Sequence, residues 1–154
     1  MTDLKEKVIL VTGAAGAIGS AVVTAVKQAG GRAIATDLAA GAGIDAALDV
    51  TAEAGWQRLA AELERQHGRL DGLVNAAGIA AVGSIEKTDF ASWRRVLSVN
   101  LDGTFLGCKH MLALLRKRGG SIVNLSSVLG LVGSANLPAY SASKGGVSLL
   151  SKSV

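Results

Sequence analysis

Tyr140 and Lys144 are the two residues whose types and spacing best suit proton transfer. Tyr140 is the only tyrosine of the chain, and Lys144 follows four residues later. Residues four apart in a helix lie on one face, about one turn apart. A phenol with a pKa of about 10 is a poor base at neutral pH, but an ammonium beside it in a partly desolvated cleft stabilises the phenolate. Taken alone, the pair also fits an ordinary helix surface.

A serine pair favours the catalytic interpretation. Ser126 and Ser127 follow the apolar run 121–125, which is typical of a buried strand. Open α/β folds bind ligands at the carboxyl ends of their strands. We therefore expect Ser127 near the same ligand as Tyr140, although a plain turn residue is the alternative.

The segment 12–19 indicates a phosphate-binding turn. It reads Thr-Gly-Ala-Ala-Gly-Ala-Ile-Gly between an apolar run and a helical pattern. Small residues let the backbone approach a diphosphate, while free amides and the helix dipole face its negative charge. A tight strand-to-helix turn without a ligand is the alternative.

Asp37 indicates which dinucleotide would bind. It ends the next apolar run, 18 residues after Gly19, where a carboxylate can accept hydrogen bonds from the adenosine ribose. A 2′-phosphate would meet like charge there, and segments 14–18 and 38–40 hold no basic residue. This favours NAD(H) over NADP(H), although Asp37 in isolation could simply begin an exposed turn.

The elements that must position these residues alternate along the chain. Strands are predicted at 8–11, 33–36, 47–50, 73–75 and 121–125. Helical patterns cover 17–29, 52–67 and 89–117, with Thr51 and Thr88 as cap candidates, and a last helix begins near Pro138. Apolar strands between amphipathic helices require a sheet covered on both faces. We expect a single α/β domain over residues 1–154, with a doubly wound (Rossmann) parallel sheet of five strands.

Composition excludes several other classes of protein. The chain has 49% hydrophobic and 18% charged residues, as in a compact fold. Its net charge is +4, but the lysines and arginines are scattered along the chain, which argues against binding to nucleic acid. The single cysteine, Cys108, and the charged opening segment 1–7 favour a reducing cytoplasm. Polar residues interrupt the uncharged stretch 119–143, so no membrane segment is expected. His67, His110 and Cys108 make no metal signature.

The cofactor motifs resemble those of the short-chain dehydrogenase/reductase family over residues 7–154. The 12–19 turn resembles that family's TGxxxGxG, with Ala17 in place of the middle glycine. Segment 75–78 resembles its NNAG, with Ala76 in place of the second asparagine, so that only Asn75 retains that side-chain role. The resemblance implies a set of cofactor-binding residues: Gly13, Ala15, Gly16, Ala17, Ile18, Gly19, Asp37, Leu38, Asp49, Val50, Asn75, Ala76, Ala77, Gly78, Tyr140 and Lys144.

The same resemblance implies four catalytic residues. Segment 140–144 matches the family's YxxxK, Ser127 stands 13 residues before Tyr140, and Asn100 lies in a Val-Asn-Leu segment. Tyr140 would be the general acid/base for the substrate oxygen, and Ser127 would hydrogen-bond that oxygen. Lys144 would favour the ionised phenol and hold the nicotinamide ribose, and Asn100 would support Lys144 through water.

The function implied is an NAD(H)-dependent oxidoreductase that interconverts a secondary alcohol and a ketone, of the hydroxysteroid, cyclic alcohol or sugar type. The alternatives are a non-catalytic dinucleotide-binding regulatory module, and a family member that catalyses dehydration or epimerisation. The resemblance also implies a homodimer or homotetramer at full length and two further strands beyond Val154. We therefore expect the isolated 154 residues to be weakly stable or dimer-dependent, and inactive.

Overall fold

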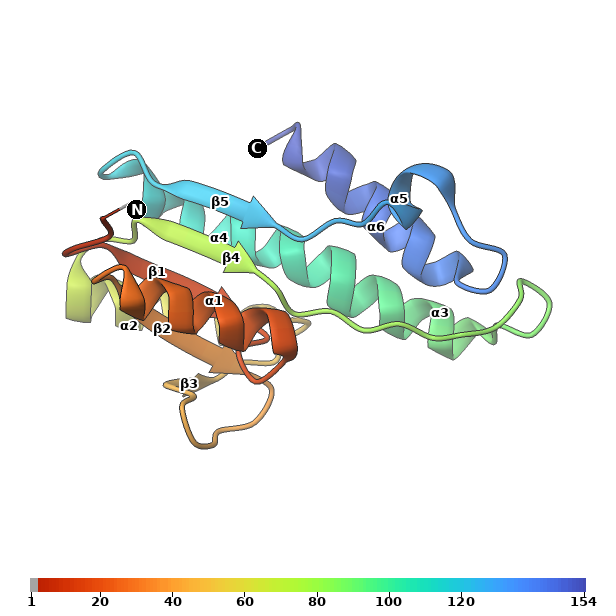
Figure 1. Cartoon of the computed structure of the whole chain (residues 1–154), viewed down its shortest axis with the longest axis horizontal. Coiled ribbons are helices and arrows are strands. Elements are labelled where there is room, and N and C mark those ends of the chain that lie inside the picture. Colours follow the sequence, from red (N-terminus) through yellow and green to blue (C-terminus); the bar gives the residue numbers. More distant parts are fainter. Residues whose placement is uncertain (1–2) are drawn as a thin grey trace.

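The five predicted strands form one parallel sheet in the order β3-β2-β1-β4-β5 (Figure 1). The computed structural model describes residues 3–154, so the first two residues of the opening segment lie outside it. The strands are β1 (Val8–Thr12), β2 (Arg32–Asp37), β3 (Ala46–Ala47), β4 (Gly72–Asn75) and β5 (Ser121–Asn124). Strands β2 and β3 are added on one side of β1, and β4 and β5 are added on the other side. The order of the strands therefore reverses between β1 and β4, which is where open α/β folds place a ligand.

Helices cover both faces of this sheet. Helix α1 (Ala17–Gln28) lies on one face, and α2 (Glu53–His67) and α4 (Gly103–Arg116) lie on the other (Figure 1). Alternate strand residues point to opposite faces, so Leu10 packs with α2 and α4 while Val11 packs with α1. Both side chains are fully buried. This confirms the doubly wound α/β arrangement.

A second group of helices extends beyond the carboxyl ends of the strands. It comprises α3 (Phe90–Leu97), the short α5 (Leu129–Val132), which the sequence did not predict, and α6 (Pro138–Ser151). The predicted helix 89–117 is continuous but contains a π-helical turn, η1 (Ser98–Asp102), between α3 and α4. Such π turns are frequent at functional sites.

Both predicted helix caps are wrong by one residue. Asp89, not Thr88, caps α3, because its carboxylate accepts a hydrogen bond from the Ser92 amide at 2.8 Å. Ala52 precedes α2 without a side-chain cap, since Thr51 instead donates to Asp49. Strand β3 ends at Ala47, so the chain has already left the sheet at Asp49. The predicted strand 47–50 is therefore too long at its carboxyl end.

The connection from β2 to β3 contains no helix, although parallel neighbours are usually joined through one. Asp45 secures this short crossover. Its carboxylate accepts from the Ala35 amide at 2.7 Å, and its own amide donates to the Ala35 carbonyl at 2.8 Å. Leu38, just past β2, is 70% exposed.

Among the described residues, no helix is long and apolar enough to cross a bilayer.

Candidate active site

A groove of about 450 Å³ opens at the carboxyl ends of β1, β2 and β4, where the sheet order reverses. It is lined by Gly13, Ala15, Gly16, Asp37, Leu38, Leu48, Val50, Ala76, Ala77, Gly78, Ile79, Arg95 and Val99. Nine of the predicted cofactor residues are among these. The groove is therefore built largely from the segments that the sequence singled out.

Glycines bring the backbone of the first turn close to its neighbours. Gly13 has a φ of 63°, and a Cβ there would lie 2.7 Å from the Cα of Ala77. A Cβ on Gly19 would lie 2.1 Å from the Gly13 carbonyl oxygen, so no larger residue fits. Helix α1 starts directly afterwards and has no acidic residue in its first turn. Its unpaired first-turn amides can therefore face an anion.

Thr12 fixes the floor of the groove, a role that sequence analysis missed. Its hydroxyl is buried and accepts hydrogen bonds from the amides of Ala76 and Ala77 at 3.1 and 3.2 Å. These bonds join the loop after β4 to the end of β1. Thr12 thereby sets the position of the 76–78 backbone opposite the glycine turn.

Asp37 lies in the groove with both carboxylate oxygens held by backbone amides. One oxygen accepts from Ala15 at 2.9 Å, and the other accepts from Leu38 at 2.7 Å. A carboxylate oxygen can accept more than one hydrogen bond, so the group can still receive ribose hydroxyls. Asp37 also ties the glycine turn to β2.

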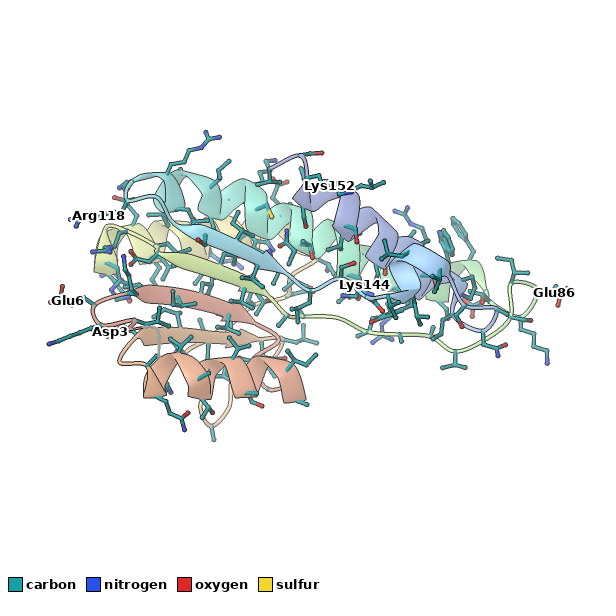
Figure 2. All side chains as sticks on the ribbon, turned by 45° about the horizontal axis from the view of Figure 1, so that its top comes forward. Asp3, Glu6, Glu86, Arg118, Lys144 and Lys152 are labelled. Carbon is teal, nitrogen blue, oxygen red and sulfur yellow. The ribbon has the colours of Figure 1, made fainter. Side chains whose placement is uncertain are left out.

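Lys144 is buried at the junction of α6 and the segment after β5 (Figure 2). Its ammonium donates a hydrogen bond to the Leu125 carbonyl at 2.5 Å and lies 5.7 Å from the centre of the Tyr140 ring. Burial lowers the pKa of this amine from its usual value. A Cβ on Gly78 would lie 3.7 Å from the ammonium nitrogen, which places Lys144 beside the end of the groove.

Asn100 joins the loop after β4 to α6. In the π-helical turn, its buried side chain accepts from the Ile79 amide at 2.8 Å and donates to the Ile79 carbonyl at 2.9 Å. It also donates to the Ser143 hydroxyl at 3.0 Å, and Ser143 in turn donates to the Tyr140 carbonyl at 2.7 Å. Asn100 therefore fixes the groove and the Tyr140 helix relative to each other.

Ser127 lies in the segment between β5 and α5, which is pressed against α6. The Ser126 hydroxyl donates to the Lys144 carbonyl at 2.9 Å, and a Cβ on Gly130 would lie 2.6 Å from the Gly145 amide nitrogen. The Ser127 hydroxyl accepts from the Leu129 amide at 3.2 Å, so its own proton is free to donate. The contacts of Ser126 and Gly130 thus place the segment that carries Ser127 beside the helix that carries Tyr140.

Several predicted cofactor residues do not line the groove. The Asp49 carboxylate turns to Thr51, and the Asn75 side chain is buried and donates to Asn124 at 2.8 Å. Ala17 and Ile18 lie exposed at the start of α1. Since the first-turn amides are what an anion would contact, only the backbone of Ala17 and Ile18 can serve that role. The Asn75 side chain, which we expected at the cofactor, instead links β4 to β5.

Four lining residues were missed by sequence analysis: Leu48, Ile79, Arg95 and Val99. The signal for two of them was the helical spacing that places Arg95 and Val99 on one face, since Val99 directly precedes Asn100 and Arg95 lies one turn earlier. Arg95 and Asp37 are the charged residues of the lining. Among residues 3–154 there is no group of three or more His, Cys, Asp or Glu side chains arranged to hold a metal ion.

The family model described as short chain dehydrogenase matches residues 7–154. An NADP-dependent (R)-specific alcohol dehydrogenase from Lentilactobacillus kefiri is 46% identical over 103 residues, which are 66% of this chain and 41% of that protein. A 3beta-hydroxysteroid dehydrogenase from Mediterraneibacter gnavus is 35% identical over an alignment of 179 residues that covers 100% of this chain and 61% of that protein. The chain thus spans less than two thirds of either relative.

A solved structure has the same fold over nearly the whole chain. The ligand-free structure of Thermoplasma acidophilum aldohexose dehydrogenase superimposes with a TM-score of 0.92 at 34% identity. The superposition covers 97% of this chain and 60% of that protein.

Proposed function

The chain belongs to the short-chain dehydrogenase family, and on that premise we propose that its protein interconverts a secondary alcohol and a ketone with NAD(H). The observation that best supports this is the position of Lys144. Its buried ammonium lies 5.7 Å from the Tyr140 ring and adjoins the end of a groove that begins at the glycine turn. A non-catalytic dinucleotide-binding module would not need a desolvated amine beside a phenol.

We propose Tyr140 as the group that exchanges a proton with the substrate oxygen. The neighbouring ammonium of Lys144 favours the phenolate, and charges act more strongly on each other in a partly desolvated site than in water. Ser127 donates its free proton to the same substrate oxygen. Asn100 keeps Tyr140 in register with the groove through Ser143 and Ile79.

The groove fits a nicotinamide dinucleotide. The close-packed glycine turn offers backbone amides to the diphosphate, and Asp37 offers carboxylate oxygens to the adenosine ribose. Leu48 and Val50 are buried apolar walls suited to the adenine ring. When bound, the cofactor would supply or accept the hydride.

We propose NAD(H) rather than NADP(H) as the cofactor, because Asp37 would repel a 2′-phosphate. The Lentilactobacillus kefiri relative is NADP-dependent, so family membership does not decide this point. For the substrate, we propose a cyclic or steroidal secondary alcohol or a sugar. The names of the hydroxysteroid and aldohexose dehydrogenases support that class.

The experiment is to incubate the intact protein with NAD and a panel of cyclic alcohols, hydroxysteroids and aldohexoses, and to follow reduced-nicotinamide absorbance. Tyr140→Phe should lose activity by at least about 10²-fold while binding NADH as before. Ser134→Ala, in the loop before α6, serves as the control and should keep its activity. Turnover by Tyr140→Phe close to that of the unsubstituted protein would refute the proposal.

A further inference from the structure

Arg95 is a positively charged residue of the groove that neither the motifs nor the catalytic residues account for. It lies in the last turn of α3 and is exposed, and it lines the groove together with Val99, one turn further on. The neighbouring Arg94 is also exposed but does not line the groove. Two adjacent arginines on one helix therefore differ in whether they can reach a bound ligand.

Within residues 3–154 the charge of Arg95 has no ion-pair partner. The acidic members of the ion pairs in this range are Asp71, Glu53 and Glu64, and each is paired with a residue other than Arg95. Asp37, the other charged residue of the lining, has its carboxylate bound to the amides of Ala15 and Leu38. The groove thus carries one anchored anion and one free guanidinium.

A guanidinium is well matched to a phosphate group, to which it can donate two parallel hydrogen bonds. The segment 12–19 holds no charged side chain, so it can offer a phosphate only backbone amides. Arg95 lines the groove from α3 and Val99 lines it from η1, whereas Gly13, Ala15 and Gly16 line it from the turn after β1. A dinucleotide phosphate is the ligand group whose charge this arrangement complements.

We infer that Arg95 is a further cofactor-binding residue, whose guanidinium pairs with a phosphate of the bound dinucleotide. This inference rests on the proposed function. The phosphate could belong to the diphosphate that both cofactors share or to the 2′-phosphate of NADP(H). The chemistry is the same for either source, so binding of the two reduced cofactors separates them.

The test is to titrate the intact protein with NADH and with NADPH and to follow nicotinamide fluorescence, using Arg95→Ala, Arg95→Lys and Arg94→Ala. Arg95→Ala should weaken binding about five- to twentyfold at low salt, and Arg95→Lys should restore part of it. Arg94→Ala should change binding by less than about twofold, because an exposed charge outside the contact contributes little. Equal losses for the two cofactors indicate the diphosphate, and a larger loss for NADPH indicates the 2′-phosphate.

Salt and adenosine distinguish ion pairing from stacking on the adenine ring. The loss caused by Arg95→Ala should shrink at about 1 M NaCl, where exposed charges are screened. Adenosine, which lacks phosphate, should compete equally well against the cofactor in the unsubstituted and Arg95→Ala proteins. A loss that persists in high salt and extends to adenosine would overturn the inference, as would normal cofactor binding by Arg95→Ala. If the unsubstituted protein binds neither cofactor, the proposed function fails as well.

Discussion

The Lys144 ammonium donates to the carbonyl oxygen of Leu125, at the carboxyl end of the edge strand β5, at 2.5 Å. The bond links α6 to the sheet through the same amine that stands beside Tyr140. Because the acceptor is a backbone atom, no substitution at Leu125 removes it. The position of the amine therefore depends on how closely α6 approaches the segment after β5.

Replacing Lys144 by Met should lower kcat/KM by about 10²- to 10⁴-fold, since the ammonium that favours the phenolate is removed while the volume of the side chain is largely kept. The measurement is steady-state kinetics on the intact protein across pH. A small loss that is the same at every pH would indicate that Lys144 serves only to pack α6.

The same variant should change how stability depends on pH. Burial lowers the pKa of Lys144 in the folded protein, so the unfolded chain binds its proton more readily. The cost of burying the charged amine is present in full below the lowered pKa and disappears as pH rises toward the unfolded value of about 10.4. Relative to Lys144→Met, the unsubstituted protein should become more stable across this alkaline range, as measured by urea unfolding. An unchanged difference would contradict this.

Gly130→Ala should separate α5 from α6. Its Cβ would lie 2.6 Å from both the Gly145 amide nitrogen and the Lys144 carbonyl carbon, which are backbone atoms that cannot rotate away. We expect a loss of about 1–3 kcal/mol in the free energy of unfolding and a lower kcat, because Ser127 moves with α5. Gly41→Ala, with no atom within 4 Å of its Cβ, is the matched control and should be neutral. Equal behaviour of the two variants would count against this packing.

Asp71→Asn should weaken the amino end of the sheet. The buried carboxylate accepts from the Val8 amide at 3.0 Å and from Lys7 and Arg69. Burial alone would raise the pKa of Asp71, but these bonds hold it below its usual value. We expect a loss of about 1–3 kcal/mol at pH 7, because an amide cannot replace all of these charged contacts.

The stability that Asp71 contributes should depend on pH in the acid range. A lowered pKa means that its stabilisation is fully present above the unfolded value of about 3.9 and is lost as pH falls through the folded value. Below about pH 3.9 the difference between Asp71→Asn and the unsubstituted protein should therefore shrink. Glu86→Gln, on the exposed loop after β4, is the control and should leave the free energy of unfolding at pH 7 nearly unchanged.

The positions of the strands along the chain and the doubly wound class of the sheet could be predicted from sequence, because apolar runs and helical periods follow simple spacing rules. The tight turn after β1 could be predicted from its glycines, and Gly13 and Gly19 do meet neighbouring backbone at distances that only glycine permits. Likewise Tyr140 and Lys144 lie one turn apart on α6, as their spacing required.

What could not be predicted depends on contacts between distant segments. Asn75 donates to Asn124, 49 residues away, so its burial between strands is invisible in the local motif. Thr12 holds the amides of residues 76 and 77, which come together only once β1 and β4 pair. Arg95 lies outside every motif and reaches the groove only because α3 projects beyond the sheet. Local spacing therefore predicted the glycine turn and the pairing of Tyr140 with Lys144, but not the walls of the groove.

The charge of Asp37 should determine which of the two cofactors binds more tightly. Its carboxylate is held by the amides of Ala15 and Leu38, so the negative charge stays fixed in the groove. Asp37→Ala should weaken NADH binding, because the ribose hydroxyls lose an acceptor, and should strengthen NADPH binding, because the repulsion of a 2′-phosphate is removed. The ratio of the two dissociation constants should move toward NADPH by about tenfold or more, since opposite shifts of even 0.7 kcal/mol, roughly threefold each, multiply.

Asp45→Ala is the matched control for this shift. Asp45 secures the same crossover through the Ala35 amide but does not line the groove. Its loss should lower stability and leave the NADH to NADPH ratio unchanged, because no charge near the ribose is altered. A similar change of ratio in both variants would mean that the shape of the crossover, rather than the charge of Asp37, sets the preference between the two cofactors.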